Sequence, residues 1–195
     1  MQKPALKYFT SEEYLALEET AEYKSEYYQG KIFAIAESSI NQDRIVRNLA
    51  LQISGSLVDK KYKVFANDLR LWVENGALFT HPDVLVVCGR PKAYKNRRDT
   101  VVNPLLIVEV TPASAQNYGR GQKFRFYRSI PTLREYLWVD QYKIHIEQFS
   151  LDQQNRWTLT DHYGDEAVLH CTSIDFKIPL RDIYHTVEFE NAKRE

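Results

Sequence analysis

The sequence is poor in the features that mark several protein classes. It has two cysteines, Cys88 and Cys171, and neither belongs to a Cys-x-x-Cys pair, so a structural zinc site is not expected. No apolar run approaches the roughly 20 residues needed to cross a bilayer. Residues 1–7 hold no apolar stretch of signal-peptide length. We therefore expect an intracellular, cytoplasmic protein with no membrane partner. In that setting Cys88, at the end of an apolar run, is expected to be a buried thiol rather than half of a disulfide, although the disulfide stays open.

The sequence also lacks an excess of charge. Its 26 Lys and Arg residues balance 26 Asp and Glu residues, for a formal net charge of zero. A protein that binds DNA by charge alone is usually basic, so this balance counts against a non-specific DNA binder. It does not count against a nuclease, whose acidic metal site can be offset by local basic patches. Residues 90–98 and 120–128 form two such patches, although each, taken alone, is better explained as an ordinary solvated face.

The remaining composition is that of a globular protein. The chain has 195 residues, of which 44% are hydrophobic and 27% charged, a balance typical of folded domains. This length suits one domain with a sizeable core. The chain has no internal repeat, low-complexity tract or linker. We therefore expect residues 1–195 to form a single domain.

Helical and strand patterns alternate along the chain. Thr10 lies three residues before Glu13, a capping-box spacing that begins a helix. Residues 24–36 have the pattern of a hairpin, and residues 39–60 repeat apolar side chains every four residues, as a long helix does. We expect further strands over 62–66, 69–73, 84–88, 105–110, 135–139, 143–149, 157–160 and 167–170, helices over 116–129 and 178–184, and a loop over 90–103. This order predicts an α/β or α+β domain with a central mixed sheet flanked by helices.

Two carboxylates stand out because of the apolar strands that carry them. Glu109 lies between Val108 and Val110 in a continuous apolar run, and an ionised carboxylate is costly to bury unless it is paired or bound to a metal. The simplest alternative is a strand-end glutamate paired with an arginine. Asp83 precedes the other continuous apolar run. If these two strands pair, both acids can converge on a hard cation such as Mg²⁺, which prefers carboxylate oxygens, water and phosphate.

Other candidate site residues have weaker signals. Lys123 lies on the helix that follows the Glu109 strand, and a helix packed back on that strand would bring its ammonium near the acids. By itself, a helical lysine is more often exposed to solvent. The five histidines have no metal-ligand spacing, and His81 is a candidate because it adjoins Pro82 and Asp83. Trp72, Trp138 and Trp157 are expected in the core or on a sheet face, and stacking on bases is an alternative for which the sequence offers no support.

The order of these motifs carries a family resemblance. Pro82-Asp83 followed by Glu109 in an apolar strand resembles the PD-(D/E)XK nuclease superfamily, and the wider pattern is similar to its Uma-two family of restriction endonucleases. The resemblance spans about residues 8–185. Its segments are Thr10–Leu15, Glu26–Ile32, His81–Val84, Asn103–Val110, Arg120–Phe124 and Leu133–Tyr136.

The resemblance implies a restriction-endonuclease-like core and Mg²⁺-dependent hydrolysis of phosphodiester bonds, with DNA as substrate and Mn²⁺ as a substitute metal. Asp83 and Glu109 match the family's metal-binding acids, with the Val110 carbonyl as a further ligand. Lys123 matches a lysine that has moved from the usual Glu-x-Lys position, here Thr111, to the following helix. Glu26 matches a further family acid. Arg120 and Arg125 are candidate phosphate contacts. By analogy, a homodimer is also expected, since such nucleases often dimerise to cut two strands.

The chain departs from the family pattern at several positions outside the metal acids. Residues 112–115 replace a Ser-Pro-Ser-Thr-like segment, Gly119 replaces an aspartate, and Asn41 and Gln42 stand where a histidine is common. These changes bear on helix capping, substrate contacts and activity. The alternative function is therefore a catalytically inactive module that keeps the nuclease fold and binds nucleic acid or protein. A third interpretation is a structural domain with a buried ion pair at Glu109.

Overall fold

The computed structural model describes residues 7–58, 60–67, 69–111 and 121–189. Its elements, in chain order, are α1 Ser11–Glu18, β1 Ser25–Tyr28, β2 Lys31–Ala34, α2 Ile40–Ser56, β3 Tyr62–Ala66, β4 Arg70–Val73, β5 Leu78–Thr80, β6 Val84–Cys88, the 3₁₀ turn Tyr94–Asn96, β7 Thr100–Val101, β8 Leu106–Thr111, α3 Phe124–Tyr127, β9 Glu135–Asp140, β10 His145–Leu151, β11 Trp157–Tyr163, β12 Val168–Cys171, β13 Phe176–Pro179 and α4 Leu180–Ile183.

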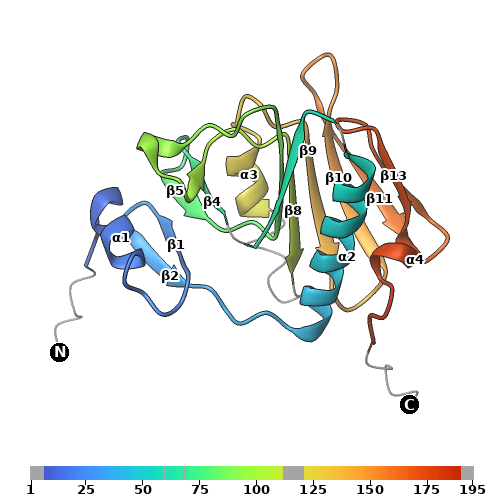
Figure 1. Cartoon of the computed structure of the whole chain (residues 1–195), viewed down its shortest axis with the longest axis horizontal. Coiled ribbons are helices and arrows are strands. Elements are labelled where there is room, and N and C mark those ends of the chain that lie inside the picture. The colour runs from blue at the N-terminus through green and yellow to red at the C-terminus, as the bar shows by residue number, and fades with distance from the viewer. Residues whose placement is uncertain (1–6, 59, 68, 112–120, 190–195) are drawn as a thin grey trace.

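The strands form one large and two smaller sheets. The large sheet is mixed and has six strands in the order β11-β10-β9-β8-β6-β3, with β8 and β9 parallel and the other pairs antiparallel. A five-stranded sheet has the order β2-β1-β5-β4-β7, and β12 pairs with β13. Figure 1 shows the N-terminal elements α1, β1 and β2 on one side of the molecule and α2 with the C-terminal strands on the other. The predicted α+β fold with a central mixed sheet and flanking helices is confirmed.

Two apolar layers cover the two faces of the large sheet. On one face, Ile45, Leu49 and Ile53 of α2 pack against residues of β6 and β8 such as Val84 and Val108. The four-residue spacing seen in the sequence is the spacing that puts these side chains on one side of a helix. On the other face, Tyr127 of α3 and residues of the five-stranded sheet pack against Ile107 and Trp138. The strand β8 thus has one face against α2 and the other toward α3 and the smaller sheet.

The predicted capping box of the first helix and the predicted hairpin are confirmed, and the long helix begins one residue after Ser39, which caps it. Thr10 caps α1 in a reciprocal capping box with Glu13, and Ser39 caps α2 by accepting the N–H of Gln42. Gln29 and Gly30 form the turn between β1 and β2, with positive φ at both residues. The predicted helix over 116–129 lies partly outside the described residues, and its described part contains the single-turn helix α3.

Several elements differ from the sequence expectation. The strand β5 was not expected, the predicted loop 90–103 contains the 3₁₀ turn and β7, and β13 includes Ile178, which was expected to be helical. Residues 69–74 alternate apolar and polar side chains, a pattern typical of a strand with one exposed face, yet Arg70 of β4 is buried against Glu18 and Asp99. Pairing with neighbouring strands, rather than local periodicity, determines these short elements. Both cysteines are free thiols.

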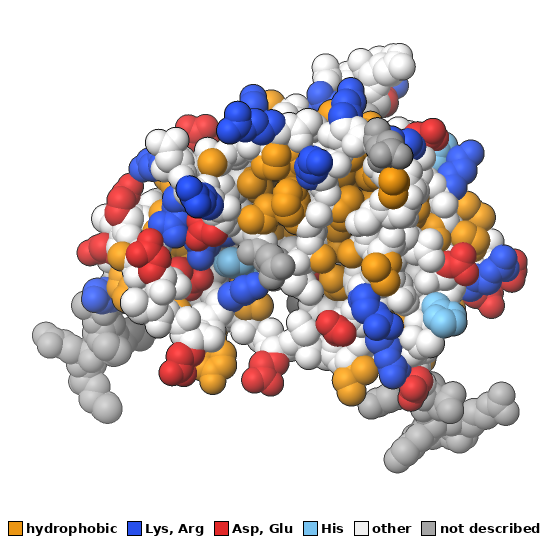
Figure 2. All heavy atoms as spheres, viewed as in Figure 1, with side chains coloured by type: hydrophobic (Ala, Val, Ile, Leu, Met, Phe, Trp, Pro, Cys, Tyr) orange, Lys and Arg blue, Asp and Glu red, His pale blue; other side chains and the backbone are white. Residues whose placement is uncertain are grey.

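The surface mixes both signs of charge. In Figure 2, lysine and arginine side chains alternate with aspartate and glutamate over the side of the molecule that carries α1 and β1, and hydrophobic side chains gather near the middle of the same view. Among the described residues, no helix is long and apolar enough to cross a membrane.

Candidate active site

Two carboxylates meet at the centre of the large sheet. The antiparallel register pairs Val84 of β6 with Val108 of β8, which puts Asp83 beside Glu109 on the face that α3 covers. Asp83 is 8% exposed and Glu109 is 3% exposed. Asp83 Oδ2 accepts the Val110 backbone N–H at 2.7 Å, so the end of β8 holds this carboxylate in place. The strand pairing on which the sequence hypothesis depended is therefore present.

Lys123 joins these acids from the residue before α3. Its Nζ lies 3.2 Å from Glu109 Oε2 and 2.7 Å from Glu26 Oε1. Lys123 is 8% exposed and Glu26 is 7% exposed. Glu26 comes from β1 of the five-stranded sheet and Glu109 from β8 of the six-stranded sheet, so the Lys123 ammonium links these two sheets. The alternative of a solvent-exposed helical lysine is therefore wrong for Lys123, and Glu26 is a buried carboxylate rather than a solvated residue of the hairpin.

Three further polar side chains hold the carboxylates, and the sequence analysis assigned none of them to the site. Tyr127 donates its hydroxyl to Glu109 Oε1 at 2.6 Å. Gln42, in the first turn of α2, donates to Asp83 Oδ1 at 3.0 Å, and Thr80 donates to Glu26 Oε1 at 2.5 Å. Tyr127 follows Lys123 by four residues, a helical spacing that points both side chains the same way. Gln42 stands at one of the two positions where the family commonly has a histidine, which is a signal for this site, whereas Thr80 has no such signal because its partner lies far away in sequence.

Burial governs the ionisation of this cluster. Desolvation raises the pKa of Glu109 to about 7, and the nearby Asp83 and Glu26 add to this effect while Lys123 opposes it. Burial likewise raises the pKa of Asp83, against the Val110 N–H and the Gln42 amide. Burial alone would lower the pKa of Lys123, but Glu109 and Glu26 outweigh it and raise this pKa well above its usual value. The lysine is therefore a permanent cation, and Glu109 titrates near neutral pH.

The donor set fits a hard divalent cation. Among the described residues, three carboxylates face one ammonium, so when fully ionised these four buried side chains have a formal excess of two negative charges. Such an excess is costly unless a cation compensates it. The side-chain atoms of these acids that can bind a metal ion are carboxylate oxygens, which Mg²⁺ and Mn²⁺ prefer. Asp83 and Glu109 are the residues that would hold the ion, whereas the contact recorded for Val110 is through its N–H, and its carbonyl as a ligand stays a prediction.

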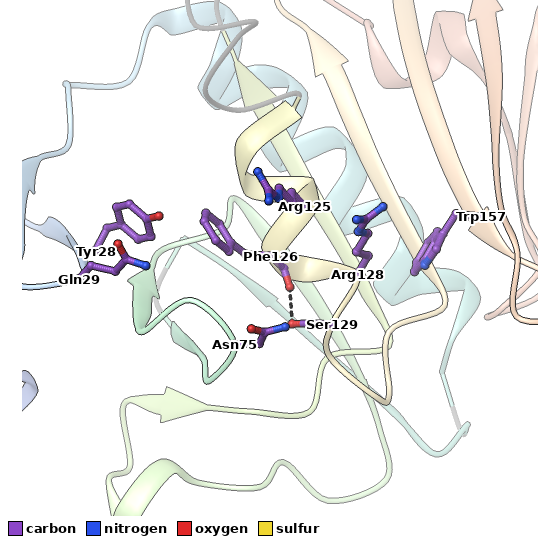
Figure 3. A pocket seen from close by; sticks show the side chains of 8 residues that line it. All are labelled: Tyr28, Gln29, Asn75, Arg125, Phe126, Arg128, Ser129 and Trp157. Atoms are coloured by element: carbon purple, nitrogen blue, oxygen red, sulfur yellow. Dashed lines mark hydrogen bonds between the residues drawn. The ribbon is translucent and has the colours of Figure 1, made fainter.

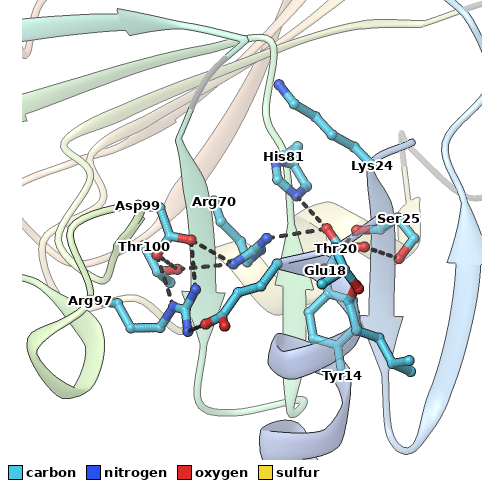
Figure 4. Close-up of polar contacts among 12 residues, drawn as sticks. Tyr14, Glu18, Thr20, Lys24, Ser25, Arg70, His81, Arg97, Asp99 and Thr100 are labelled. Carbon is cyan, nitrogen blue, oxygen red and sulfur yellow. Dashed lines mark hydrogen bonds and ion pairs between the residues drawn. The ribbon is translucent and has the colours of Figure 1, made fainter. Parts of the chain in front are cut away.

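The remaining predicted residues lie elsewhere. The His81 imidazole packs beside Glu18, with Nε2 3.8 Å from Glu18 Oε2, in a cluster that includes Arg70 and Asp99 (Figure 4). Within the described residues its side chain makes no contact with the Asp83 or Glu109 carboxylates. Arg125 is exposed on the outer side of α3, in a groove (Figure 3). Arg120 lies outside the described residues.

A second polar cluster lies on the β10–β11 pair. His145, Glu147 and Asp161 each offer a ligand atom, and these atoms lie within 4.8 Å of one another. His145 and Glu147 are two residues apart on β10, and Asp161 of β11 lies opposite Glu147, so the spacing of the histidines alone does not reveal this cluster. The whole strand β9 separates β10 from β8, so this cluster is not part of the Glu109 site.

The fold is shared with a solved structure. Its similarity to the crystal structure of "a putative nuclease belonging to DUF820" from Anabaena variabilis ATCC 29413 has a TM-score of 0.73 and covers 90% of this chain and 97% of that chain, at 16% sequence identity. The family is given by the sequence itself: residues 11–181 match the model of the Uma2 family, described as "Putative restriction endonuclease", and the chain belongs to this family. The resemblance inferred from the motifs is thus confirmed.

Two relatives from Synechocystis sp. (strain ATCC 27184 / PCC 6803 / Kazusa) align over nearly their full length. The uncharacterized protein sll1609 is 40% identical over 161 residues, covering 83% of this chain and 91% of the relative. The uncharacterized protein slr1290 is 30% identical over 180 residues, covering 91% of this chain and 92% of the relative. Neither name states an activity, so the chemistry has to be argued from the site.

Proposed function

We propose that this protein is a Mg²⁺-dependent endonuclease that hydrolyses phosphodiester bonds in DNA, with Mn²⁺ as a substitute metal. The observation that carries the proposal is the buried cluster of Asp83, Glu109 and Glu26 around the ammonium of Lys123. Membership of a family described as a restriction endonuclease supports it. Asp83 and Glu109 hold the ion in this proposal, with the Val110 carbonyl as a further ligand.

The residues around the ion have separate tasks. Mg²⁺, when bound, supplies Lewis acidity toward the phosphate and makes water nucleophilic at neutral pH. Lys123 keeps a fixed positive charge that offsets the negative charge of the phosphate as the bond breaks. Tyr127 and Gln42 each donate to one oxygen of a carboxylate and so fix its orientation. Glu26 positions Lys123 through their ion pair at 2.7 Å. Arg120 and Arg125 are proposed to contact phosphates beyond the scissile bond.

The test compares cleavage of DNA by the wild-type protein and by isosteric variants. Glu109→Gln and Asp83→Asn keep the shape of the site and remove one charge, and each is expected to reduce Mg²⁺-dependent cleavage by at least about a hundredfold. Glu135→Gln is the matched control, because Glu135 is equally buried but binds Gln148, Thr172 and Ser173 at the start of β9. It is expected to cut at the wild-type rate. Equal cleavage by all of these proteins would show that the site is wrong.

The alternative function is a nuclease-fold module that binds nucleic acid or protein without cutting. It is favoured by the zero net charge and by the polar residues that the chain lacks after Glu109. It predicts binding without cleavage in either Mg²⁺ or Mn²⁺. Crystals soaked in Mn²⁺ add a direct readout, since an ion between Asp83 and Glu109 supports the enzyme. The third interpretation, a structural domain with a buried ion pair at Glu109, fits the Glu109–Lys123 pair and predicts neither cleavage nor a bound Mn²⁺ ion.

A further inference from the structure

A groove of about 610 Å³ lies along the outer side of α3. Figure 3 shows Arg125, Phe126 and Arg128 of the α3 segment beside it, with Tyr28 on one side and Trp157 on the other. The lining residues are Tyr28, Gln29, Asn75, Arg125, Phe126, Arg128, Ser129 and Trp157. They are arginines, amides, aromatic residues and one serine, and none of these eight side chains is acidic.

The two arginines of the groove lack the ion pairs that some other exposed arginines form. Arg156 pairs with Asp152, and Arg181 pairs with Glu166. Arg125 and Arg128 are both exposed. Neither side chain forms an ion pair or hydrogen bond with any part of the chain that the structure describes. Two uncompensated guanidinium groups in one groove match the bidentate geometry of phosphate oxygens.

The aromatic side chains of the groove are supported from the protein side. The Trp157 ring meets Phe124 edge-on, with centroids 5.2 Å apart, and the Tyr28 ring packs on Phe126 at 5.2 Å. Both rings are half-buried, so part of each remains accessible from the groove. Aromatic side chains beside a basic groove stack on the bases of unpaired nucleic-acid strands. The amides of Gln29 and Asn75 can donate to and accept from base edges.

The groove shares two elements with the carboxylate site. On β1, Glu26 belongs to the site and Tyr28, two residues later, lines the groove. At α3, Lys123 belongs to the site and Arg128 lines the groove. Lys123 and Arg128 flank the single turn of α3 on its two sides, so the groove adjoins the carboxylate site.

We propose that this groove binds an unpaired segment of the nucleic-acid strand that flanks the scissile phosphate, with Arg125 and Arg128 on phosphates and Trp157 on a base. The inference rests on the proposed function and adds to it the strand form of the substrate. A paired duplex presents phosphates to the arginines but no free base face to Trp157. The proposal therefore predicts separate effects of the arginines and of the tryptophan.

The arginine test measures binding of fluorescently labelled oligothymidylate of about 16 nucleotides in EDTA, so that no strand is cut. Arg125→Gln/Arg128→Gln is expected to reduce the slope of log affinity against log salt by about 1.4, the value for two phosphate contacts on a single strand. The matched control is Arg156→Gln/Arg181→Gln, which removes the same charge from exposed arginines outside the groove and is expected to keep the wild-type slope. Equal salt-dependence slopes for all three proteins, or no binding by the wild type, would overturn the proposal that the groove binds a nucleic-acid strand.

The tryptophan test compares the single strand with a duplex of equal length. Trp157→Ala is expected to weaken single-strand binding roughly 5- to 100-fold, the range for loss of one base–aromatic stack, and to leave duplex binding unchanged. Trp157→Phe keeps a ring and is expected to retain most of the affinity, and thermal melting verifies that each variant is folded. Equal losses on both probes would contradict the unpaired-strand assignment. Cleavage by the wild type in Mg²⁺ is measured separately. If the double arginine variant changes the slope but the wild type does not cut, only the proposed catalysis is contradicted. If the wild type cuts but the slope is unchanged, only the proposed role of the groove is contradicted.

Discussion

Glu109 is the residue at which burial and charge conflict most strongly. It lies in the apolar strand β8 and is in contact with both Lys123 and Tyr127. Desolvation raises its pKa from 4.5 to about 7. Between these two values the folded protein keeps a proton that the unfolded chain has already released. The stability contributed by this group therefore falls as the pH rises through this range.

In EDTA, we expect this group to make the protein less stable as the pH rises from about 4.5 to about 7. The reason is that the folded state binds more protons than the unfolded state in this window, so each increase in pH favours unfolding. The raised pKa of Asp83 acts in the same direction. Mg²⁺ requires ionised carboxylates, so its stabilising effect is expected to increase as the pH passes through about 7. Thermal melting between about pH 5 and about pH 8, with and without Mg²⁺, measures both effects.

Glu109→Gln isolates this contribution, since an amide does not titrate. The melting temperature of the wild type minus that of the variant is expected to fall as the pH rises in EDTA. In Mg²⁺ the same difference is expected to increase with pH. A wild-type advantage over Glu109→Gln that grows with pH in EDTA would contradict the raised pKa.

At the scale of elements, the turn between β4 and β5 is fitted against α3. Gly76 in this turn has φ of +151°, and a Cβ built there would lie 2.7 Å from Phe126 Cδ1. Glycine is required both for this backbone conformation and for the close approach of the aromatic ring. Since Phe126 belongs to the helix that follows Lys123, the turn helps to fix the helix beside the carboxylate site.

Alanine substitutions at three glycines are expected to have distinct effects. Gly76→Ala is expected to cost about 1–3 kcal/mol, because it adds strain and a clash. Gly89→Ala, with φ of +75° but open space around it, is expected to cost about 1 kcal/mol from strain alone. Gly55→Ala, in α2 with nothing within 4 Å, is expected to stabilise by about 0.5–1 kcal/mol. Urea unfolding measures all three, and a Gly76→Ala protein as stable as wild type would contradict the close fit of the turn against α3.

The elements also differ in how well the sequence predicted them. Thr10 and Ser39 cap α1 and α2 through bonds to residues three positions ahead, so the signal is local and could be read. The strands β5 and β7 have three and two residues, too few for a visible period. They exist because β1 and β4 offer them backbone partners, and such partners cannot be read from a local pattern.

At the scale of the whole molecule, one apolar layer joins the two larger sheets. Leu71 and Val73 of the five-stranded sheet belong to the same buried cluster as Ile107 and Trp138 of the six-stranded sheet. Glu26 and Lys123 add an ion pair between the β1 side and the large sheet. The five-stranded and six-stranded sheets bury their facing apolar side chains only against each other. We therefore propose that residues 1–195 unfold as one cooperative unit.

Unfolding in urea is accordingly expected to give one transition, with coincident curves from far-ultraviolet circular dichroism and tryptophan fluorescence. Leu71→Ala, at a fully buried position, is expected to lower stability by about 2–5 kcal/mol in both signals together. The control is Leu51→Ala at a side chain that is 64% exposed, for which a change within about 0.5 kcal/mol is expected. Two separate transitions, of which only one responds to Leu71→Ala, would indicate two independent domains.

The sequence by itself determined the α+β class, the long amphipathic helix and the two acids, because periodicity and the cost of a carboxylate in an apolar strand are local properties. It suggested Lys123 and Glu26 only through a family resemblance. The tertiary structure decided that these two side chains are buried with Glu109, that Tyr127 and Gln42 hold the carboxylates, and that His81 faces Glu18 instead. Residues of β1, α2, β8 and α3 meet at this site. A side chain's charge partner across such distances in sequence depends on packing, which no local pattern records.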